Sequence, residues 1–464
     1  MAQSNKDFLK RISVLLKHNQ ELLEENDKIK KLVEKLTEEN EEQKELLEKF
    51  SKGATGKQYI EKEPSLKFNM ATVLYANIHG FTKIQESMNT QSIMDELDLI
   101  LFEFDRVLKK YKIEKIKTIG DSYMAAGGIP VKNMTNPIQV VMAALEMEFF
   151  LNDLPAKMGR KDKIWELKLG IHTGPVVATV SGKSKISYDI KGDTVNIASR
   201  MEAHGKDGVV LVSVMTYELV KELFDCEYYG KMPVKYKGDL EMYRVKGLLP
   251  EFSETAAHIP NRAFDTKFKL VQFTEMQEVI LQKLENELPS HLYYHNVKHT
   301  VDVVTEVELI GWAENLSDDE ILLIKTAGLF HDVGHVIAYD DHEFHGTVIA
   351  REVLPTYGYT EEQINTICET IMATKLPPQP KGILQEIICD SDLDYLGRSD
   401  MIPVSNTLYK ELKEQNKVGT LNDWNKLQVK FITNHQYFTK TARSLREVNK
   451  QLQIERIKSL ITPD

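Results

Sequence analysis

The sequence contains few cysteines, no excess of basic residues and no long apolar run. Its 464 residues include three cysteines, Cys226, Cys368 and Cys389. Because they are few, odd in number and widely spaced, they argue against a disulfide framework or a cysteine zinc site. The formal net charge of -11 argues against nucleic acid as the main partner. No apolar run is long enough to cross a bilayer, and the charged N-terminus lacks a signal-peptide core. These absences favour a cytoplasmic protein without a membrane span.

A heptad pattern occupies residues 8–50. The two seams are Ile12, Asn19, Asn26, Val33, Asn40 and Leu47, and Phe8, Leu15, Leu22, Ile29, Leu36, Gln43 and Phe50. Glu and Lys fill most other positions, and three asparagines on one seam favour two parallel strands. We therefore expect residues 1–52 to form a parallel coiled coil that pairs two copies of the chain. The alternative is a lone solvated helix, which would leave the apolar stripe in water.

From about residue 66 the pattern changes to alternating strands and helices. Strands are predicted at 71–78, 167–171, 175–180 and 209–212, helices at 91–110, 137–154 and 194–203, and a hairpin over 113–126. This order suggests an antiparallel α+β sandwich of ferredoxin-like type. Residues 250–262 resemble a linker, and nine of the thirteen histidines lie beyond residue 257, where helical periodicity dominates. That shift predicts an all-α domain.

Three motifs in the first half bear on phosphate chemistry. They are YANIHGFT at 75–82, KIKTIGDSY at 115–123 and YDIKGDTVNIASRM at 188–201. Over about residues 68–248, these motifs resemble the class III nucleotidyl cyclases. The resemblance implies an α+β cyclase domain that forms ATP-derived 3′,5′-cyclic AMP at the interface of a head-to-tail dimer.

The resemblance implies two aspartates that bridge two cations, Mg²⁺ or Mn²⁺. The second aspartate matches Asp121, but the first matches Asn77, whose neutral amide is a much weaker ligand for such cations. The domain is then a weakened or inactive cyclase, or Asn77 was introduced to trap substrate. Whether Asn77 is native is left open by the sequence.

The remaining motif positions are assigned to nucleotide binding by the same resemblance. Lys117 and Asp189 match the adenine-reading positions, because Lys can donate to a ring nitrogen and Asp can accept from the exocyclic amine. Asn196 and Arg200, four apart on one helix face, match the residues that orient the ribose and stabilise charge in the transition state. The segment after the first strand cradles the triphosphate, and a later lysine contacts the outer phosphates; these residues are Ile78, Gly80, Phe81, Thr82 and Lys235, with Lys237 as a weaker candidate.

Three further motifs lie in the second half: YHNVKH at 294–299, FHDVGH at 330–335 and CDSD at 389–392. Over residues 290–400 they resemble the HD superfamily of metal-dependent phosphohydrolases, which includes cyclic-nucleotide phosphodiesterases. The resemblance implies metal ligands at His299, His331, Asp332 and Asp392, with Asp390 as the alternative to Asp392. It implies that His295 is the general acid; His295 and His299 would share one face if both were helical.

Other histidines in this region extend the predicted centre. His335 and His342 would complete a second metal site or its outer shell, and His345 follows them. Imidazole and carboxylate ligands suit Fe, Mn or Zn, with Mg²⁺ where oxygens dominate. Weaker candidates for substrate contacts are Lys375, His435 and Arg443.

The sequence therefore predicts a multidomain enzyme: a coiled coil at 1–52, a cyclase domain at 60–250 and an all-α HD domain at 263–464. The expected function is a homodimeric adenylyl cyclase fused to a phosphodiesterase that hydrolyses a cyclic nucleotide, most economically cyclic AMP to AMP. The alternative is a phosphohydrolase regulated by an ATP-binding, catalytically impaired cyclase domain. A scaffold with two inactive domains is disfavoured by Asp121, Arg200 and the His331-Asp332 pair.

Overall fold

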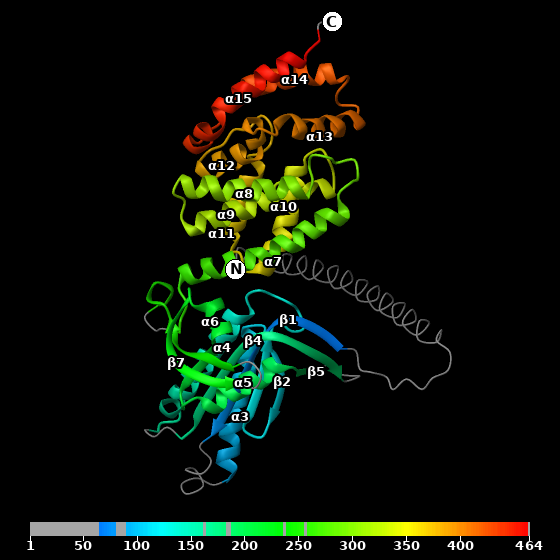
Figure 1. Ribbon diagram of the computed structural model, residues 1–464. Helices are drawn as coiled ribbons and strands as arrows, with labels where there is room; N and C mark the ends of the chain where they lie inside the picture. The colour runs from blue at the N-terminus through cyan, green and yellow to red at the C-terminus, as the bar shows by residue number, and fades with distance from the viewer. Residues whose placement is uncertain are drawn as a thin grey trace, which may run out of the picture. The chain divides into compact units, whose positions relative to one another are not determined.

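The computed structural model describes residues 65–79, 90–160, 164–181, 187–234, 238–254 and 258–462 (Figure 1). The predicted coiled coil lies outside these ranges, as do Gly80, Phe81, Thr82 and Lys235. Among the helices of the described ranges, none combines the length and apolar character needed to cross a bilayer.

The first half of the described chain folds around one eight-stranded sheet. Its strands are β1 (Ser65–His79), β2 (Glu114–Ile119), β3 (Ser122–Gly127), β4 (Glu166–Ser181), β5 (Ser187–Lys191), β6 (Val209–Ser213), β7 (Phe224–Val234) and β8 (Gly238–Leu248). Their order is β2-β3-β1-β4-β6-β8-β7, with β5 paired to β4. Every pair is antiparallel except β4 with β6, which are parallel. The chain between these two strands includes a helix, as the crossover between parallel strands usually does. The α+β class is confirmed, but a wholly antiparallel sheet is wrong.

Strand β4 also differs from expectation, because the strands predicted at 167–171 and 175–180 form one continuous element. It pairs along β1, and the irregularity falls in β1 instead, where the register shifts between Phe68 and Ala71. Gly174 lets helix α5 (Asp193–His204) approach β4 closely, since an added Cβ would lie 2.7 Å from Thr194 Oγ1. The glycine is thus needed for helix packing and does not end the strand.

Helices cover both faces of this sheet. Helices α3 (Thr90–Lys110) and α4 (Asn136–Lys157) share a core with alternate residues of β1, among them Ala76 and Ile78. Because side chains alternate along a strand, Asn77 points to the opposite face, which α5 covers. A short helix, α6 (Val214–Val220), precedes β7.

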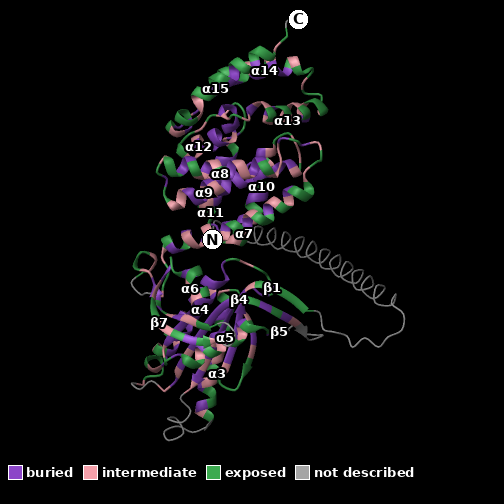
Figure 2. Cartoon of the chain, viewed as in Figure 1, coloured by how far each residue is buried: buried purple, intermediate pink, exposed green. Residues whose placement is uncertain are grey.

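The chain after the sheet is helical, which confirms the predicted all-α domain. After the short η1 (Pro250–Phe252), its α-helices are α7 (Arg262–Glu287), α8 (Val297–Ala313), α9 (Asp318–Phe330), α10 (His342–Val353), α11 (Glu361–Met372), α12 (Ile383–Asp392), α13 (Met401–Glu414), α14 (Leu421–Asn434) and α15 (Lys440–Leu460). Three further 3₁₀ turns, η2 (Val333–Val336), η3 (Leu354–Tyr357) and η4 (Asp394–Gly397), join them. Figure 2 shows buried positions running through the sheet and through α8 and α9.

Helix α7 contributes to both hydrophobic cores. Phe264, near its start, belongs to the core of the sheet domain. Phe273 and Met276, further along the same helix, belong to the core of the helical domain. Glu275, next to Met276 on the same helix, accepts a hydrogen bond from the Thr135 N–H at 3.0 Å, where α4 begins. A carboxylate at this position is favourable because the first N–H groups of a helix lack partners within the helix.

Candidate functional sites

Asn296 begins helix α8 and separates the two histidines that the sequence places four apart. Its side chain accepts a hydrogen bond from the His299 N–H at 3.2 Å, as an N-cap residue does. His299 therefore lies in the first turn of α8, whereas His295 lies in the turn before the helix. The condition for a shared helix face, that both histidines be helical, is therefore not met, because Asn296 caps the helix with non-helical backbone.

Four predicted ligands converge where α8, α9 and α12 meet. His299 Nε2 lies 3.3 Å from His331 Nε2 and 3.1 Å from Asp392 Oδ1. Asp332 Oδ2 lies 3.3 Å from His299 Nε2 and 3.2 Å from His331 Nε2. The His331 ring donates a hydrogen bond from Nδ1 to the Gly328 carbonyl at 2.8 Å. The lone pair of Nε2 is therefore the one that can bind a metal ion.

Asp390, the alternative to Asp392, makes different contacts. Its carboxylate accepts hydrogen bonds from the backbone N–H groups of Phe438 and Thr439, both at 2.8 Å, just before α15. Asp392 is therefore the carboxylate of this segment that faces the histidines.

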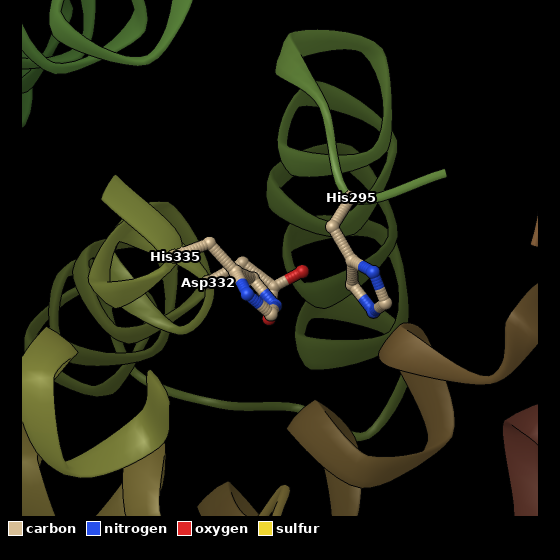
Figure 3. Close-up of side chains that lie close together, drawn as sticks. All are labelled: His295, Asp332 and His335. Atoms are coloured by element: carbon tan, nitrogen blue, oxygen red, sulfur yellow. The ribbon is translucent and has the colours of Figure 1, made fainter. Parts of the chain in front are cut away.

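Asp332 also belongs to a second group of ligand atoms. Its Oδ1 lies 3.4 Å from His342 Nε2 and 4.0 Å from His335 Nε2. One ligand atom each from His295, Asp332 and His335 lie within 4.8 Å of one another, and Figure 3 shows His295 facing the other two. The two oxygens of Asp332 thus point to two neighbouring positions, as in sites that hold a pair of divalent cations.

The electrostatics of these side chains fit bound cations. His335 is 2% exposed, and neither of its ring nitrogens hydrogen-bonds to a described residue; the same holds for Asp332 Oδ2. Burial lowers the pKa of His335 to about 2, so the ring is neutral and can act as a ligand. Burial opposes charge on His331, yet the adjacent Asp332 raises the pKa of His331 well above its usual value. A divalent cation at this position would take over the positive charge that the proton carries.

Glu411 is a site residue that sequence reasoning missed. It lies 116 residues after His295, whose Nδ1 donates to Glu411 Oε1. The Glu411 carboxylate also accepts from the Tyr294 N–H at 3.0 Å. Burial opposes its charge, but the hydrogen bond from His295 lowers the pKa of Glu411. The sequence did contain a signal for this residue: a glutamate between Leu408 and Leu412, on the inner face of α13. A carboxylate buried there needs a hydrogen-bonding or charged partner.

A cavity of about 580 Å³ lies beside His295, Asp332 and Asp392. Its further walls are largely apolar and aromatic; they include Tyr294, Tyr339, Leu376, Leu393, Tyr395, Leu396, Leu408, Leu412, Trp424, Leu427, Phe431 and Ile432. Gln428 supplies an amide to this wall, and its Oε1 accepts a hydrogen bond from Ser405 Oγ. The cavity therefore joins the metal-ligand cluster to a surface suited to a flat, partly polar ring.

The weaker candidates from the sequence differ in whether they line this cavity. Lys375 lines it and pairs with Asp341, Nζ to Oδ1 at 2.6 Å. His345, His435 and Arg443 are not among its lining residues; the Arg443 guanidinium instead donates to backbone carbonyls before α15. A proline-rich turn after α11 brings Lys375 to the cavity, which periodicity did not reveal.

In the sheet domain, the structure brings Asn77 and Asp121 together. Asn77 pairs with Ser122 across β1 and β3, and its Nδ2 donates to Ser122 Oγ at 3.3 Å. The Asp121 carbonyl in the hairpin turn accepts from the Ile78 N–H at 3.0 Å. The two predicted ligand positions are therefore neighbours at one end of the central strands.

Asn77 nevertheless fits a metal ligand poorly. Its Oδ1 lies 3.0 Å from His79 Nδ1, so both ends of the amide already have hydrogen-bonding partners. A neutral amide oxygen is also a weaker ligand for a hard divalent cation than a carboxylate. This pair offers one carboxylate, Asp121, where the family pattern has two.

The predicted base-reading residues form an ion pair. Lys117 Nζ on β2 lies 2.9 Å from Asp189 Oδ1 on β5. Asn196 and Arg200 are both exposed and lie one turn apart on α5. These four side chains are therefore at the surface of the sheet domain, where a second molecule can reach them.

Two family models match the chain. Residues 63–247 match the adenylate and guanylate cyclase catalytic domain, and residues 296–396 match the HD domain. The chain therefore carries a class III adenylate/guanylate cyclase catalytic domain followed by an HD domain. Both kinds of domain depend on divalent metals, and the His-Asp clusters described above lie within or near the second match.

Relatives of the first domain include both nucleotide classes. An adenylate cyclase of Mycobacterium tuberculosis is 35% identical over 181 residues, which cover 39% of this chain and 40% of that protein. The receptor-type guanylate cyclase gcy-8 of Caenorhabditis elegans is 35% identical over 194 residues, covering 41% of this chain and 17% of that protein. The chain thus spans less than half the length of these relatives.

Among solved structures, the guanylate cyclase domain of RhGC from Catenaria anguillulae in complex with GTP is 30% identical. The match covers 40% of this chain and 100% of that chain, with a TM-score of 0.36.

Proposed function

We propose that the chain is a bifunctional cyclic-nucleotide enzyme, with an adenylyl cyclase domain and an HD domain that hydrolyses cyclic AMP to AMP. The observation that carries the second activity is the convergence of His299, His331, Asp332 and Asp392 beside the His295–Glu411 pair at one cavity. Bound divalent cations would activate a water molecule and neutralise phosphate charge there. One cation would be held by His299, His331, Asp332 and Asp392, and the other by Asp332, His335 and His342.

His295 is suited to donate a proton to the leaving oxygen. Its Nδ1 is engaged by Glu411, so Nε2 is the nitrogen left for substrate, and His295 lines the cavity. The buried carboxylate of Glu411 stabilises the protonated ring and fixes its orientation, as a general acid requires. The leaving 3′ oxygen of a cyclic nucleotide needs such a proton because an alkoxide is a poor leaving group.

The charges around the cavity favour a substrate of low charge. Asp332, Asp340, Asp341, Glu343 and Asp392 line it, and Lys375 is the one lysine or arginine among its described lining residues. Two divalent cations would offset most of this negative charge, leaving little to bind a triphosphate. A cyclic phosphodiester carries a single negative charge, and the apolar walls with Gln428 offer a surface for its base.

A panel of substrates tests the hydrolase proposal. The purified full chain is incubated with Mn²⁺ and cyclic AMP, cyclic GMP, cyclic dinucleotides or ATP. We expect cyclic AMP to be hydrolysed with the highest kcat/KM. Preferential hydrolysis of ATP, or of a cyclic dinucleotide, would contradict the proposed substrate class.

The cyclase activity is proposed to require two copies of the chain. Asn196 and Arg200 are exposed on α5, and an active site shared between protomers would use them from one side and Asp121 from the other. The predicted coil at 1–52 would supply the pairing. A homodimer through both regions is thus part of the proposal.

A second candidate function follows from the contacts of Asn77. Because His79 and Ser122 engage its amide, the first domain would bind ATP without efficient turnover and regulate the HD domain. A changed rate of cyclic AMP hydrolysis in the presence of a non-hydrolysable ATP analogue would support this candidate.

Asn77→Asp separates the two candidates. We expect the substitution to raise cyclic AMP formation from Mn²⁺-ATP by about 10²-fold or more, because a carboxylate replaces a neutral ligand; a gain of this size is about 2.7 kcal/mol of transition-state stabilisation. Ser122→Ala, which removes the other partner of the Asn77 amide, is the control and should produce no such gain. Failure of Asn77→Asp to form any product would count against the cyclase proposal.

Lys117→Glu tests the proposed choice of base. The substitution places two carboxylates, Glu at 117 and Asp189, where an ion pair of 2.9 Å now lies, and it removes the donor to an adenine ring nitrogen. We expect ATP preference over GTP to fall by about 10-fold to 10³-fold, the range for losing a specific hydrogen-bonding group. Competition between labelled ATP and GTP measures it, with Lys115→Glu as the control; an unchanged ratio would refute the assignment.

A further inference from the structure

Three side chains to which no motif assigns a role, His79, Glu166 and Asp207, meet at one end of the sheet. His79 ends β1, Glu166 begins β4 directly opposite it, and Asp207 lies in the turn before β6. The Gly208 N–H donates to the Leu167 carbonyl at 2.8 Å, which holds this turn against β4. One ligand atom from each of the three side chains lies within 4.8 Å of the others. The backbone of β1, β4 and the turn before β6 thus brings an imidazole and two carboxylates to one point.

Asn77 determines which nitrogen of His79 faces the carboxylates. The Asn77 Nδ2 donates to Ser122, so its Oδ1 is the end that meets His79 Nδ1, at 3.0 Å. An amide oxygen only accepts, so Nδ1 carries a proton. The other nitrogen, Nε2, is hydrogen-bonded to Asp207 Oδ1, and a bound cation would take the place of the proton between them. This is the arrangement of a metal-bound histidine, which donates its second N–H to a nearby oxygen.

The two carboxylates are themselves in contact. Glu166 is hydrogen-bonded to Asp207. Two carboxylates this close repel each other unless a proton or a cation lies between them. His79 and Asp207 are 30% and 40% exposed, so an ion can reach the cluster from solvent.

We propose that His79, Glu166 and Asp207 bind one divalent transition-metal cation, with Asn77 as the residue that orients the imidazole. One nitrogen and two carboxylate oxygens suit Mn²⁺ or Zn²⁺ better than Mg²⁺, which prefers oxygen ligands alone. Asn77 then serves the cation through His79 and does not coordinate it. The site is separate from the HD centre and does not depend on either proposed activity.

Mn²⁺ binding to the full chain tests this site, followed by the loss of the free Mn²⁺ electron paramagnetic resonance signal. We expect the unmodified chain to bind one more Mn²⁺ per chain than His79→Gln or Asp207→Asn. His204→Gln and Asp225→Asn, which alter a histidine and an aspartate elsewhere in the same domain, should match the unmodified chain. Circular dichroism and Tm establish that each variant is folded; Asp207, in an exposed turn, gives the second variant if His79→Gln does not fold.

Two more variants distinguish the alternatives. Asn77→Leu removes the oxygen that orients His79 and should weaken this one site by about 10-fold to 100-fold, the usual effect of losing such a partner. Asp121→Asn, which alters the predicted cyclase ligand position, should leave in place the ion that depends on His79 and Asp207. Loss of an ion in Asp121→Asn but not in His79→Gln would place the cation at Asp121 and overturn the proposal. Equal binding by the unmodified chain and both ligand variants would also overturn it, and would identify the cluster as an ion pair of protonated His79 with Asp207.

Discussion

Asp332→Ala is expected to lower metal-dependent hydrolysis by at least about 10³-fold, or about 4 kcal/mol, and to remove bound metal from the HD domain. The reason is that Asp332 serves both groups of ligands: Oδ2 faces His299 and His331, and Oδ1 faces His342. Its loss would also leave two buried imidazoles without the carboxylate that balances their charge. Elemental analysis after desalting, together with turnover of the best substrate from the panel, measures both effects.

Asp318→Asn is the matched control for this experiment. Asp318 begins helix α9, which ends at Phe330, two residues before Asp332, and it pairs with Lys267 at 2.9 Å, one helix length away from the histidines. Its variant should keep full metal content and activity. Retention of the full metal content by Asp332→Ala would exclude Asp332 as the shared ligand.

Glu411→Gln is expected to reduce kcat for cyclic AMP by about 10²-fold to 10⁴-fold, the range for a general acid whose proton transfer is impaired. A glutamine still occupies the space but cannot balance charge on the His295 ring, to which Glu411 Oε1 is hydrogen-bonded. The effect should depend on the leaving group. Bis(p-nitrophenyl) phosphate releases a stable phenolate that needs no proton, so its hydrolysis should fall by less than about 10-fold.

The contrast between the two substrates separates proton donation from structural support. His295→Gln should give the same pattern, since the two residues act as one unit. Glu414→Gln changes a carboxylate one turn further along α13, where it accepts from Tyr293 Oη at 2.7 Å, and should leave both rates unchanged. Equal losses with both substrates would mean that Glu411 maintains the shape of the site and does not assist protonation.

The sheet domain illustrates what periodicity reveals and what it does not. The buried strand read at 71–78 predicted β1, which begins six residues earlier, at Ser65, and the turn at Gly120-Asp121 predicted the β2–β3 hairpin. The same approach split β4 in two, because Gly174 and Pro175 usually interrupt strands. The close packing of α5 on β4, which makes a glycine necessary there, is a contact between elements and has no local signal.

The candidate sites follow the same division. The resemblance to the HD superfamily singled out His299, His331, Asp332 and Asp392 as candidates, and the structure brings these side chains together. The sequence kept Asp390 as an alternative to Asp392, because both precede the same turn. In the structure the Asp390 carboxylate accepts a hydrogen bond from the Phe438 N–H, which leaves Asp392 to face the histidines. The spacing gave His295 and His299 a shared face only if both were helical, whereas α8 begins after the Asn296 cap and His295 precedes it.

The sequence by itself determined that a cyclase-type domain precedes an HD-type domain, and which residue types could bind metal and nucleotide, because motifs are local. The tertiary structure decided which of them meet. Glu411 reaches His295 across 116 residues, and His79, Glu166 and Asp207 come together from two strands and a turn. Charges separated so far along the chain become partners only when folding removes water from between them, and no local pattern records that step.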